Sequence, residues 1–276
     1  MYYLEAIAHN PRGERVVHIL AVLILVAMIA PKALAEDESG SSPAVDVASI
    51  PEMPSPSFRM YNPFRMFFRG VEVRITWAGP PDKPIVALTF DDGPHPVFTP
   101  QILRILEDHG VPATFFVIGR NAERNPELLR LAKEKGHALG NHTFSHTRIT
   151  AATNGRLKEE IERTREIIFL ETGVYTQLFR PPFGAFDARS LAEVAHRDLE
   201  VVLWSVDSRD WATHSIGDIR RNVEKRVHPG AIILMHDVHQ QTVEALPGLL
   251  EFLKGKGYTF VTIPELLPID RVAWGG

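Results

Sequence analysis

From about residue 70 onward, short apolar runs alternate with stretches of helical period. The runs are rich in β-branched and aromatic residues, which is typical of strands buried in a parallel sheet. They cover residues 85–90, 113–118, 138–141, 178–180, 201–206, 231–235 and 258–263. The polar-apolar pattern between them predicts amphipathic helices at residues 126–135, 156–171, 188–196, 216–226 and 243–254.

A further helix is predicted to begin at Thr99-Pro100, with Thr99 as N-cap and Pro100 as the first helical residue. Strand and helix then alternate about seven times, which predicts parallel βα units. These units fit either a closed or nearly closed barrel or a doubly wound sheet. In both folds, functional residues gather where the carboxyl ends of the strands lead into loops. Residues 61–78, ahead of these units, are interpreted as an added strand or a flap.

The N-terminus has the pattern of an export signal. An apolar run at residues 19–30 follows Arg12 and Arg15. It is shorter than the roughly 20 residues that span a bilayer, but it suits the apolar core of a signal peptide. Small residues on both sides of Leu34 predict cleavage after Ala35, with an uncleaved membrane anchor as the alternative.

The three expected segments are therefore a signal peptide at residues 1–35, a linker at 36–63 and the folded, functional domain at 64–276. The linker is rich in Ser and Pro and has no sustained apolar period.

Composition narrows the possible functions. The chain has 276 residues and a formal net charge of −4, so nucleic acid is not an expected partner. It contains no cysteine, which excludes disulfides, a thiolate nucleophile and a cysteine zinc site. Any metal must be held by His, Asp or Glu.

Chemically capable side chains follow five of the predicted strands. They are Asp91-Asp92, His142 with His146, Arg180, Asp210-Trp211, and His236. Taken one at a time, these residues also fit an acidic turn, a polar loop, a surface salt bridge or a core histidine. At neighbouring strand ends, however, two His and one carboxylate form a ligand set that leaves positions open for water and substrate, as in catalytic zinc sites.

The remaining residues fit hydrolysis at such a site. One of the two adjacent aspartates can act as general base, and Arg180 can hold that carboxylate. The backbone N–H of Phe183 is available to an oxyanion. Asp210 can favour the imidazolium form of His236, which would then protonate a leaving group.

The stretches TFDDGPHP, NHTFSH, RPPFG, DSRDW and IILMH occur in this order between Lys83 and Pro268. They resemble the five motifs of the polysaccharide deacetylases of carbohydrate esterase family 4. The resemblance implies an α/β fold, a distorted (β/α)7 TIM-like barrel. It also implies hydrolysis of acetamido groups, or in some members acetate esters, on polysaccharides. Phe183 stands where Tyr is common, and Ala185 stands where many members carry a basic residue.

The resemblance also implies a role for each matching position. Asp91 would be the base, and Asp92, His142 and His146 would bind one divalent metal. Zinc is expected first, with cobalt or manganese as alternatives. Arg180 would orient the base.

The later motifs supply the rest of the implied site. Phe183 would donate its backbone N–H to the oxyanion, and His236 would be the acid, tuned by Asp210. Trp211 and Leu234 would line the acetate pocket.

The expected function is N-deacetylation of a polysaccharide that contains N-acetylglucosamine, such as chitin oligomers or peptidoglycan. The alternatives are an O-acetyl esterase of the xylan type, a hydrolase of non-sugar linear amides and, least favoured, a non-catalytic carbohydrate-binding protein. The protein is expected to be exported to the periplasm, the cell envelope or the medium. It would contact a membrane only through an uncleaved N-terminal segment. The sequence does not specify an oligomeric state, the polymer or the metal.

Overall fold

The computed structural model describes residues 64–68 and 71–267. The predicted signal peptide, the predicted linker and the last nine residues, 268–276, lie outside the described residues. Within the described part of the chain, no helix combines the length and the apolar character needed to cross a membrane.

The described strands form one sheet in the order β1-β2-β7-β6-β5-β4-β3-β9-β8, with β10 beside the first half of β3. All neighbours are parallel except β1 and β2, which form an antiparallel hairpin. The strands are β1 (Phe64–Phe68), β2 (Val71–Thr76), β3 (Ile85–Asp91), β4 (Thr114–Val117), β5 (Ala138–Asn141), β6 (Leu178–Phe179), β7 (Glu200–Val202), β8 (Val206–Asp207), β9 (Ala231–His236) and β10 (Thr259–Phe260).

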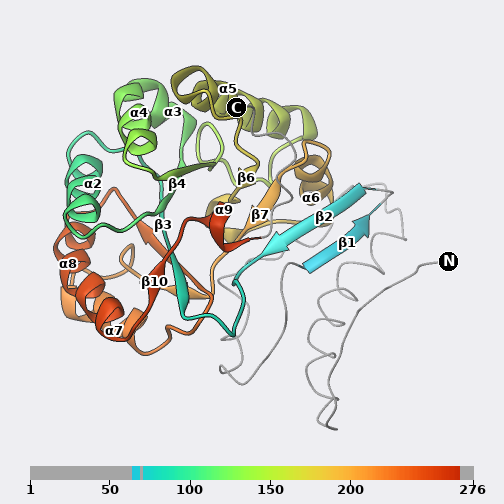
Figure 1. Cartoon of the computed structure of the whole chain (residues 1–276). Helices are drawn as coiled ribbons and strands as arrows, with labels where there is room; N and C mark the ends of the chain where they lie inside the picture. The colour runs from blue at the N-terminus through green and yellow to red at the C-terminus, as the bar shows by residue number, and fades with distance from the viewer. Residues whose placement is uncertain (1–63, 69–70, 268–276) are drawn as a thin grey trace, which may run out of the picture.

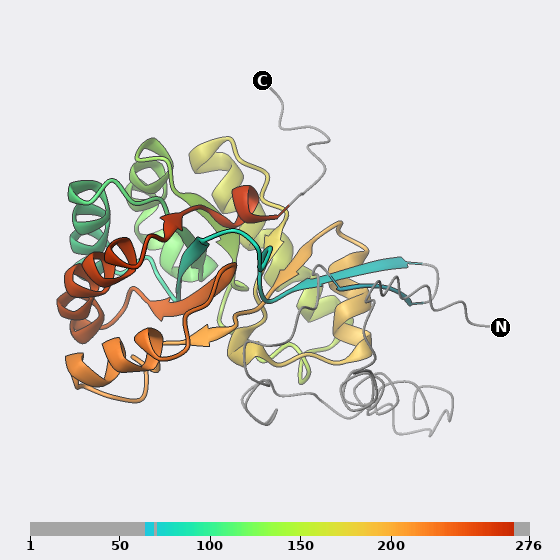
Figure 2. The same cartoon turned by 60° about the horizontal axis from the view of Figure 1, so that its bottom comes forward.

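The longer helices surround the sheet on its outside (Figure 1). The hairpin β1–β2 continues the sheet beyond β7, beside α6 (Figure 2). The helical elements are α2 (Phe98–Asp108), α3 (Gly119–Arg124), α4 (Pro126–Glu134), α5 (Asn154–Thr172), the 3₁₀ turn η2 (Pro182–Gly184), α6 (Ala188–Ala195), α7 (Ile216–Glu224), α8 (Gln240–Gly255) and α9 (Ile263–Leu266).

A three-residue link makes the sheet curl. β7 and β8 lie far apart in the sheet order, yet only residues 203–205 join them. The N–H of Leu203 donates to Thr76 at 2.7 Å, beside β7, while the N–H of Ser205 donates to Ile232 of β9 at 3.1 Å. The two regions of the sheet must therefore approach each other. The result is a curled half-barrel, which confirms the predicted barrel and excludes the doubly wound sheet.

The link also corrects one prediction. Residues 201–206 were expected to form a single strand, because the run is apolar almost throughout. The structure has two strands there, β7 and β8, which pair with different neighbours. The spacing of apolar residues does not reveal that the run is divided into two strands, because β7 and the start of β8 are both buried.

The two faces of strand β3 contact different parts of the protein interior. Val86, Leu88 and Phe90 belong to the core beneath the outer helices, whereas Ala87 belongs to a smaller cluster inside the curl. Side chains alternate along a strand, so Thr89 and Asp91 face the inside as well. The inside of the barrel is thus apolar at the level of Ala87 and polar toward the carboxyl end of β3.

The start of α2 differs from expectation. The N-cap is Val97 rather than Thr99, and the ring of His95 accepts hydrogen bonds from the N–H groups of Val97 and Phe98 at 3.2 and 3.3 Å. The hydroxyl of Thr99 instead donates a hydrogen bond to the buried carboxyl of Asp237. That partner lies 138 residues away along the chain, so local sequence rules could not have identified it.

Candidate functional site

The carboxyl ends of the parallel strands bring the predicted residues to one end of the barrel. Asp91 of β3 lies directly opposite His236 of β9. Asn141 of β5 pairs with Phe179 of β6, so the residues that follow them, His142 and Arg180, leave their strands side by side.

Asp92, His142 and His146 form a cluster whose ligand atoms all lie within 4.8 Å of one another. Oδ1 of Asp92 is 3.4 Å from Nε2 of His142 and 3.3 Å from Nε2 of His146. This oxygen is buried and has no hydrogen-bond partner. A buried carboxylate oxygen facing two imidazole nitrogens is the donor set expected for a divalent ion, so these residues fit a metal.

Protonation in the cluster also suits a metal. Burial opposes ionisation of Asp92, but the nearby His142, together with His236 and His146, outweighs it and holds the pKa of Asp92 well below its usual value. Burial, with the nearby His142, lowers the pKa of His146. An ionised carboxylate beside a neutral imidazole is the state that binds metal ions.

Local backbone geometry places these ligands. Asp92 has a φ of 76°, so its side chain leaves the line of β3, and Nδ2 of Asn121 donates to its carbonyl at 2.7 Å. Nδ1 of His142 lies 2.7 Å from the carbonyl oxygen of Arg180. If Nδ1 carries the proton, that bond leaves the Nε2 lone pair facing Asp92.

Asp91 and Arg180 form a buried ion pair. Nη1 of Arg180 donates to Oδ1 of Asp91 at 2.7 Å and to the hydroxyl of Thr89 at 2.8 Å. Nε and Nη2 donate to the carbonyl oxygens of Val202 and Leu203, each at 3.0 Å. These two carbonyls lie where the chain leaves β7 for β8, so the same guanidinium holds the carboxylate and the curl of the sheet.

His236 is paired with Asp210, which follows β8, the strand beside β9. Nδ1 of His236 lies 2.7 Å from Oδ1 of Asp210, while Oδ2 accepts from the His236 N–H at 2.8 Å and from Thr242 at 2.6 Å. Burial favours the neutral ring, but the hydrogen bond and charge of Asp210 prevail and raise the pKa of His236 to about 9. The imidazole is therefore charged at neutral pH.

The other expected residues surround this cluster. Phe183 has a φ of 62°, and its half-exposed ring lies 4.6 Å from the ring of His146. Leu234 is buried on β9. Trp211 is 54% exposed, so much of its ring faces solvent rather than packing in the core.

Asp237 was not singled out from the sequence. Its carboxyl is buried behind the turn that follows β3, so close to Gly93 that a Cβ there would come within 2.0 Å of Oδ2. Burial, reinforced by Asp91 and Asp92, raises the pKa of Asp237 to about 7. The signal that could have revealed it is an Asp directly after the buried run that ends in His236.

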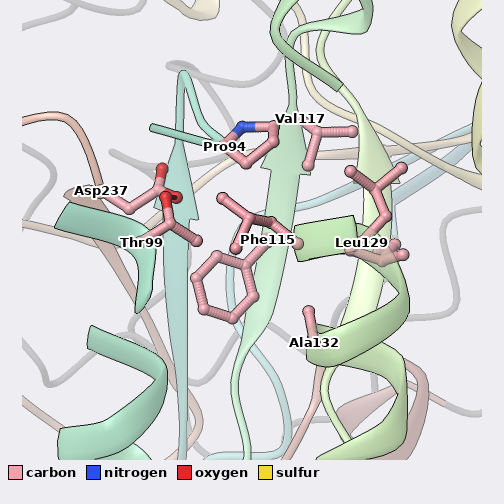
Figure 3. Close-up of a pocket in the computed structure, with 9 residues that line it drawn as sticks. Pro94, Thr99, Phe115, Val117, Leu129, Ala132 and Asp237 are labelled. Carbon is pink, nitrogen blue, oxygen red and sulfur yellow. Dashed lines mark hydrogen bonds between the residues drawn. The ribbon is translucent and has the colours of Figure 1, made fainter. Parts of the chain in front are cut away.

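Figure 3 shows this carboxyl beside a small cavity between the sheet and helices α2 and α4. The cavity is lined by none of the predicted site residues, so it is separate from the cluster of Asp92, His142 and His146. Its lining residues are Pro94, Thr99, Phe115, Val117, Leu128, Leu129, Ala132, Leu139 and Asp237.

Glu160 of α5 is a second residue that the sequence did not reveal. Its side chain is 1% exposed and accepts hydrogen bonds from the loop that carries His142 and His146. The helical spacing of apolar residues places Glu160 on the inner face of α5, but nothing in the sequence identifies the groups that its carboxylate binds.

Residues 78–202 match the family model described as polysaccharide deacetylase. A peptidoglycan-N-acetylglucosamine deacetylase of Bacillus cereus is 39% identical over 199 residues, which cover 70% of this chain and 92% of the relative. A chitooligosaccharide deacetylase of Sinorhizobium fredii is 38% identical over 196 residues, with coverages of 66% and 91%. Both are named as deacetylases, hydrolases of carbon–nitrogen bonds.

A third relative is longer. The peptidoglycan-N-acetylglucosamine deacetylase PgdA of Listeria monocytogenes is 39% identical over 181 residues, which are 66% of this chain but only 38% of that protein. Among solved structures, the Bc1960 peptidoglycan N-acetylglucosamine deacetylase superposes with a TM-score of 0.68 at 37% identity, covering 70% of this chain and 92% of the other. The curled sheet with outer helices is therefore the (β/α)7 fold of these enzymes.

Proposed function

Because the chain belongs to the polysaccharide deacetylase family, we propose that it is a metal-dependent deacetylase that removes N-acetyl groups from a polysaccharide containing N-acetylglucosamine. Peptidoglycan and chitin oligomers are the two candidate substrates, because the similar proteins of Bacillus cereus and Sinorhizobium fredii are named as deacetylases of these polymers. Peptidoglycan lies outside the cytoplasmic membrane, so this substrate would agree with the export expected from the signal pattern at residues 1–35.

One observation carries this proposal. A candidate metal-ligand cluster (Asp92, His142 and His146), a carboxylate paired with Arg180 (Asp91) and a charged imidazole (His236) lie together at the carboxyl ends of the strands of one barrel. A non-catalytic binding protein would not need all three. Hydrolysis of an amide needs a site for water, a base and an acid for the departing amine.

The metal would be held by the three-residue cluster, and zinc is the ion we propose. When bound, a divalent ion supplies Lewis-acid chemistry, which polarises the acetamide carbonyl and lowers the pKa of water.

Asp91 is placed to act as the base. Arg180 occupies Oδ1, whereas Oδ2 faces the cluster at 3.9 Å from Nε2 of His142. Oδ2 is therefore the oxygen that accepts a proton from the attacking water. Because Arg180 fixes the other oxygen, the carboxylate cannot rotate away during the reaction.

The remaining groups handle charge and the leaving group. The backbone N–H of Phe183 would donate to the oxyanion that develops on the carbonyl. The ring of His236, held through Nδ1 by Asp210, presents Nε2 to the amine and protonates it as the C–N bond breaks. Leu234 and Trp211 would bound the space for the acetyl methyl group.

The direct test is acetate release by the full-length protein, first stripped of metal and then given Zn²⁺. The substrates are a chitin oligomer, peptidoglycan and acetylated xylan. We expect Zn²⁺ to restore release from one of the two N-acetylated polymers, and His142→Ala to abolish it because a ligand is lost. Release from xylan alone would establish the O-acetyl alternative. No release from any polymer by metal-loaded protein would overturn the assignment.

The pH dependence of kcat gives a second test. Only the protonated His236 can serve as acid, so kcat should fall as pH rises through its raised pKa of about 9. Asp210→Asn removes the charge that favours the imidazolium. We therefore expect its alkaline limb to move to lower pH, with a lower plateau.

The control for this pH test is Asp218→Asn on the surface of α7, which should keep the wild-type profile. Identical alkaline limbs in wild type and Asp210→Asn would contradict the role of His236.

A further inference from the structure

The loop after β5 carries two of the three ligands in an unusual backbone conformation. Thr143 and His146 have φ values of 63° and 59°, in the left-handed region that L side chains other than Asn and Asp rarely adopt. Such residues persist only where surrounding contacts hold the chain in place. The contacts that hold this loop therefore decide where the ligands lie.

The two histidines are not held equally. His142 directly follows a strand, and its ring is fixed by the carbonyl oxygen of Arg180 at 2.7 Å. The ring of His146 has Asp92 as its one polar partner at ion-pair distance among the residues that the structure describes. Its place must come from ring packing against Phe183 and from the backbone that carries it.

Backbone hydrogen bonds secure the first part of the loop. The N–H of Gly119 donates to the carbonyl of Thr143, and that of Arg120 to the carbonyl of Phe144, each at 2.9 Å. The side chain of Asn141 accepts from the N–H of Thr143 at 2.8 Å. These contacts end at Phe144, two residues before His146.

The carboxylate of Glu160 binds the next part of the loop, on both sides of His146. Its Oε2 accepts from the N–H of Ser145 at 2.7 Å, and its Oε1 accepts from the Ser145 hydroxyl at 2.6 Å. Thr147 donates to the same oxygen at 3.2 Å, and Nη2 of Arg156 lies 2.5 Å from it. The carboxylate thus binds the residues on both sides of His146.

This arrangement explains a charge that would otherwise be costly. A carboxylate that is 1% exposed is tolerated only when its oxygens are hydrogen-bonded or paired. Three of the four groups that contact the Glu160 carboxylate belong to Ser145 and Thr147, the two neighbours of His146 in the chain, and only Arg156 belongs to its own helix.

We propose that Glu160 is a positioning residue for the metal site: its buried carboxylate fixes Ser145 and Thr147 so that His146 reaches the ion defined by Asp92 and His142. The inference rests on the metal site of the proposed function. It concerns affinity for the ion and is measured without substrate.

The experiment compares full-length wild type with Glu160→Gln. Dissociation constants for Zn²⁺ are measured by competition with a chromophoric chelator, and the visible spectrum of the Co²⁺ form is recorded. Residues that orient metal ligands typically change affinity by roughly 10–100-fold when mutated, and we expect a loss of this size, with an altered Co²⁺ spectrum.

Glu159→Gln is the matched control. Glu159 is the preceding residue of α5 and also pairs with Arg156, at 3.0 Å, but its side chain is 60% exposed. It should bind Zn²⁺ as wild type does. The unfolding midpoint of each metal-free protein separates a loss of ion affinity from a general loss of stability.

Ser145→Ala provides a second variant if Glu160→Gln does not fold. It removes the hydroxyl that donates to Oε1, so a smaller loss of Zn²⁺ affinity is expected, and the two substitutions together should be less than additive. Wild-type affinity in Glu160→Gln, or in Ser145→Ala where only that variant folds, would overturn the inference. A wild type that binds no metal would instead overturn the proposed function.

Discussion

Asp91→Asn is expected to lose roughly 10²–10⁴-fold in kcat while keeping its bound metal, because it removes the base and leaves the ligand set intact. Asn has nearly the same shape as Asp and can still accept the hydrogen bond that Arg180 donates at 2.7 Å. The loss would therefore report the missing proton acceptor rather than a displaced side chain. Acetate release and metal content are measured on the same preparation.

Asp82→Asn is a suitable control for this substitution. Asp82 is an exposed carboxyl in the turn before β3, and its variant should keep the wild-type kcat. A loss in Asp91→Asn smaller than roughly tenfold would show that another group takes the proton. Loss of the metal in the same variant would show instead that Asp91 is a ligand.

Arg180→Met is expected to lower the free energy of unfolding by about 3–5 kcal/mol, the usual cost of removing one partner of a buried ion pair. The guanidinium is fully buried, and its removal takes away the arginine that pairs with Asp91 at 2.7 Å. It also leaves the carbonyls of Val202 and Leu203 without their donors. Denaturant unfolding followed by circular dichroism measures the change.

Two further variants make this result interpretable. Arg180→Lys keeps the charge but loses the forked geometry, so its loss should be smaller. Arg104→Met removes an arginine that is 83% exposed on α2, and it should change stability by no more than about 0.5 kcal/mol. If Arg180→Met were as stable as Arg104→Met, the ion pair would not be what holds Asp91 and the curl together.

The strands, the outer helices and the position of the site follow from the sequence because each signal is local. Apolar runs mark the strands, and the polar residues directly after them must lie at one end of a parallel sheet. Asp91 and His236 are 145 positions apart in the chain, yet each ends an apolar run, and the structure pairs them across β3 and β9.

The features that the sequence did not reveal depend on partners that are not neighbours in the chain. Thr99 has the residue type of an N-cap, but its hydroxyl binds Asp237. The helical spacing of residues predicts only that Glu160 lies on the inner face of α5, and it does not predict that its carboxylate accepts hydrogen bonds from Ser145 and Thr147. The division of residues 201–206 depends on Thr76 and Ile232, which draw the backbone to two different strands.

The order of strands in the curled sheet bears on how the chain folds as it is made. β3 lies early in the sequence, whereas its partner β9 lies near the end. For example, the hydroxyl of Thr89 donates a hydrogen bond to the carbonyl oxygen of Ile233, 144 positions later. The central strand therefore has an unpaired edge until nearly the whole domain is available. Contacts of such separation slow folding. A nascent chain must keep its apolar β3 edge from pairing with other chains until β9 has been made.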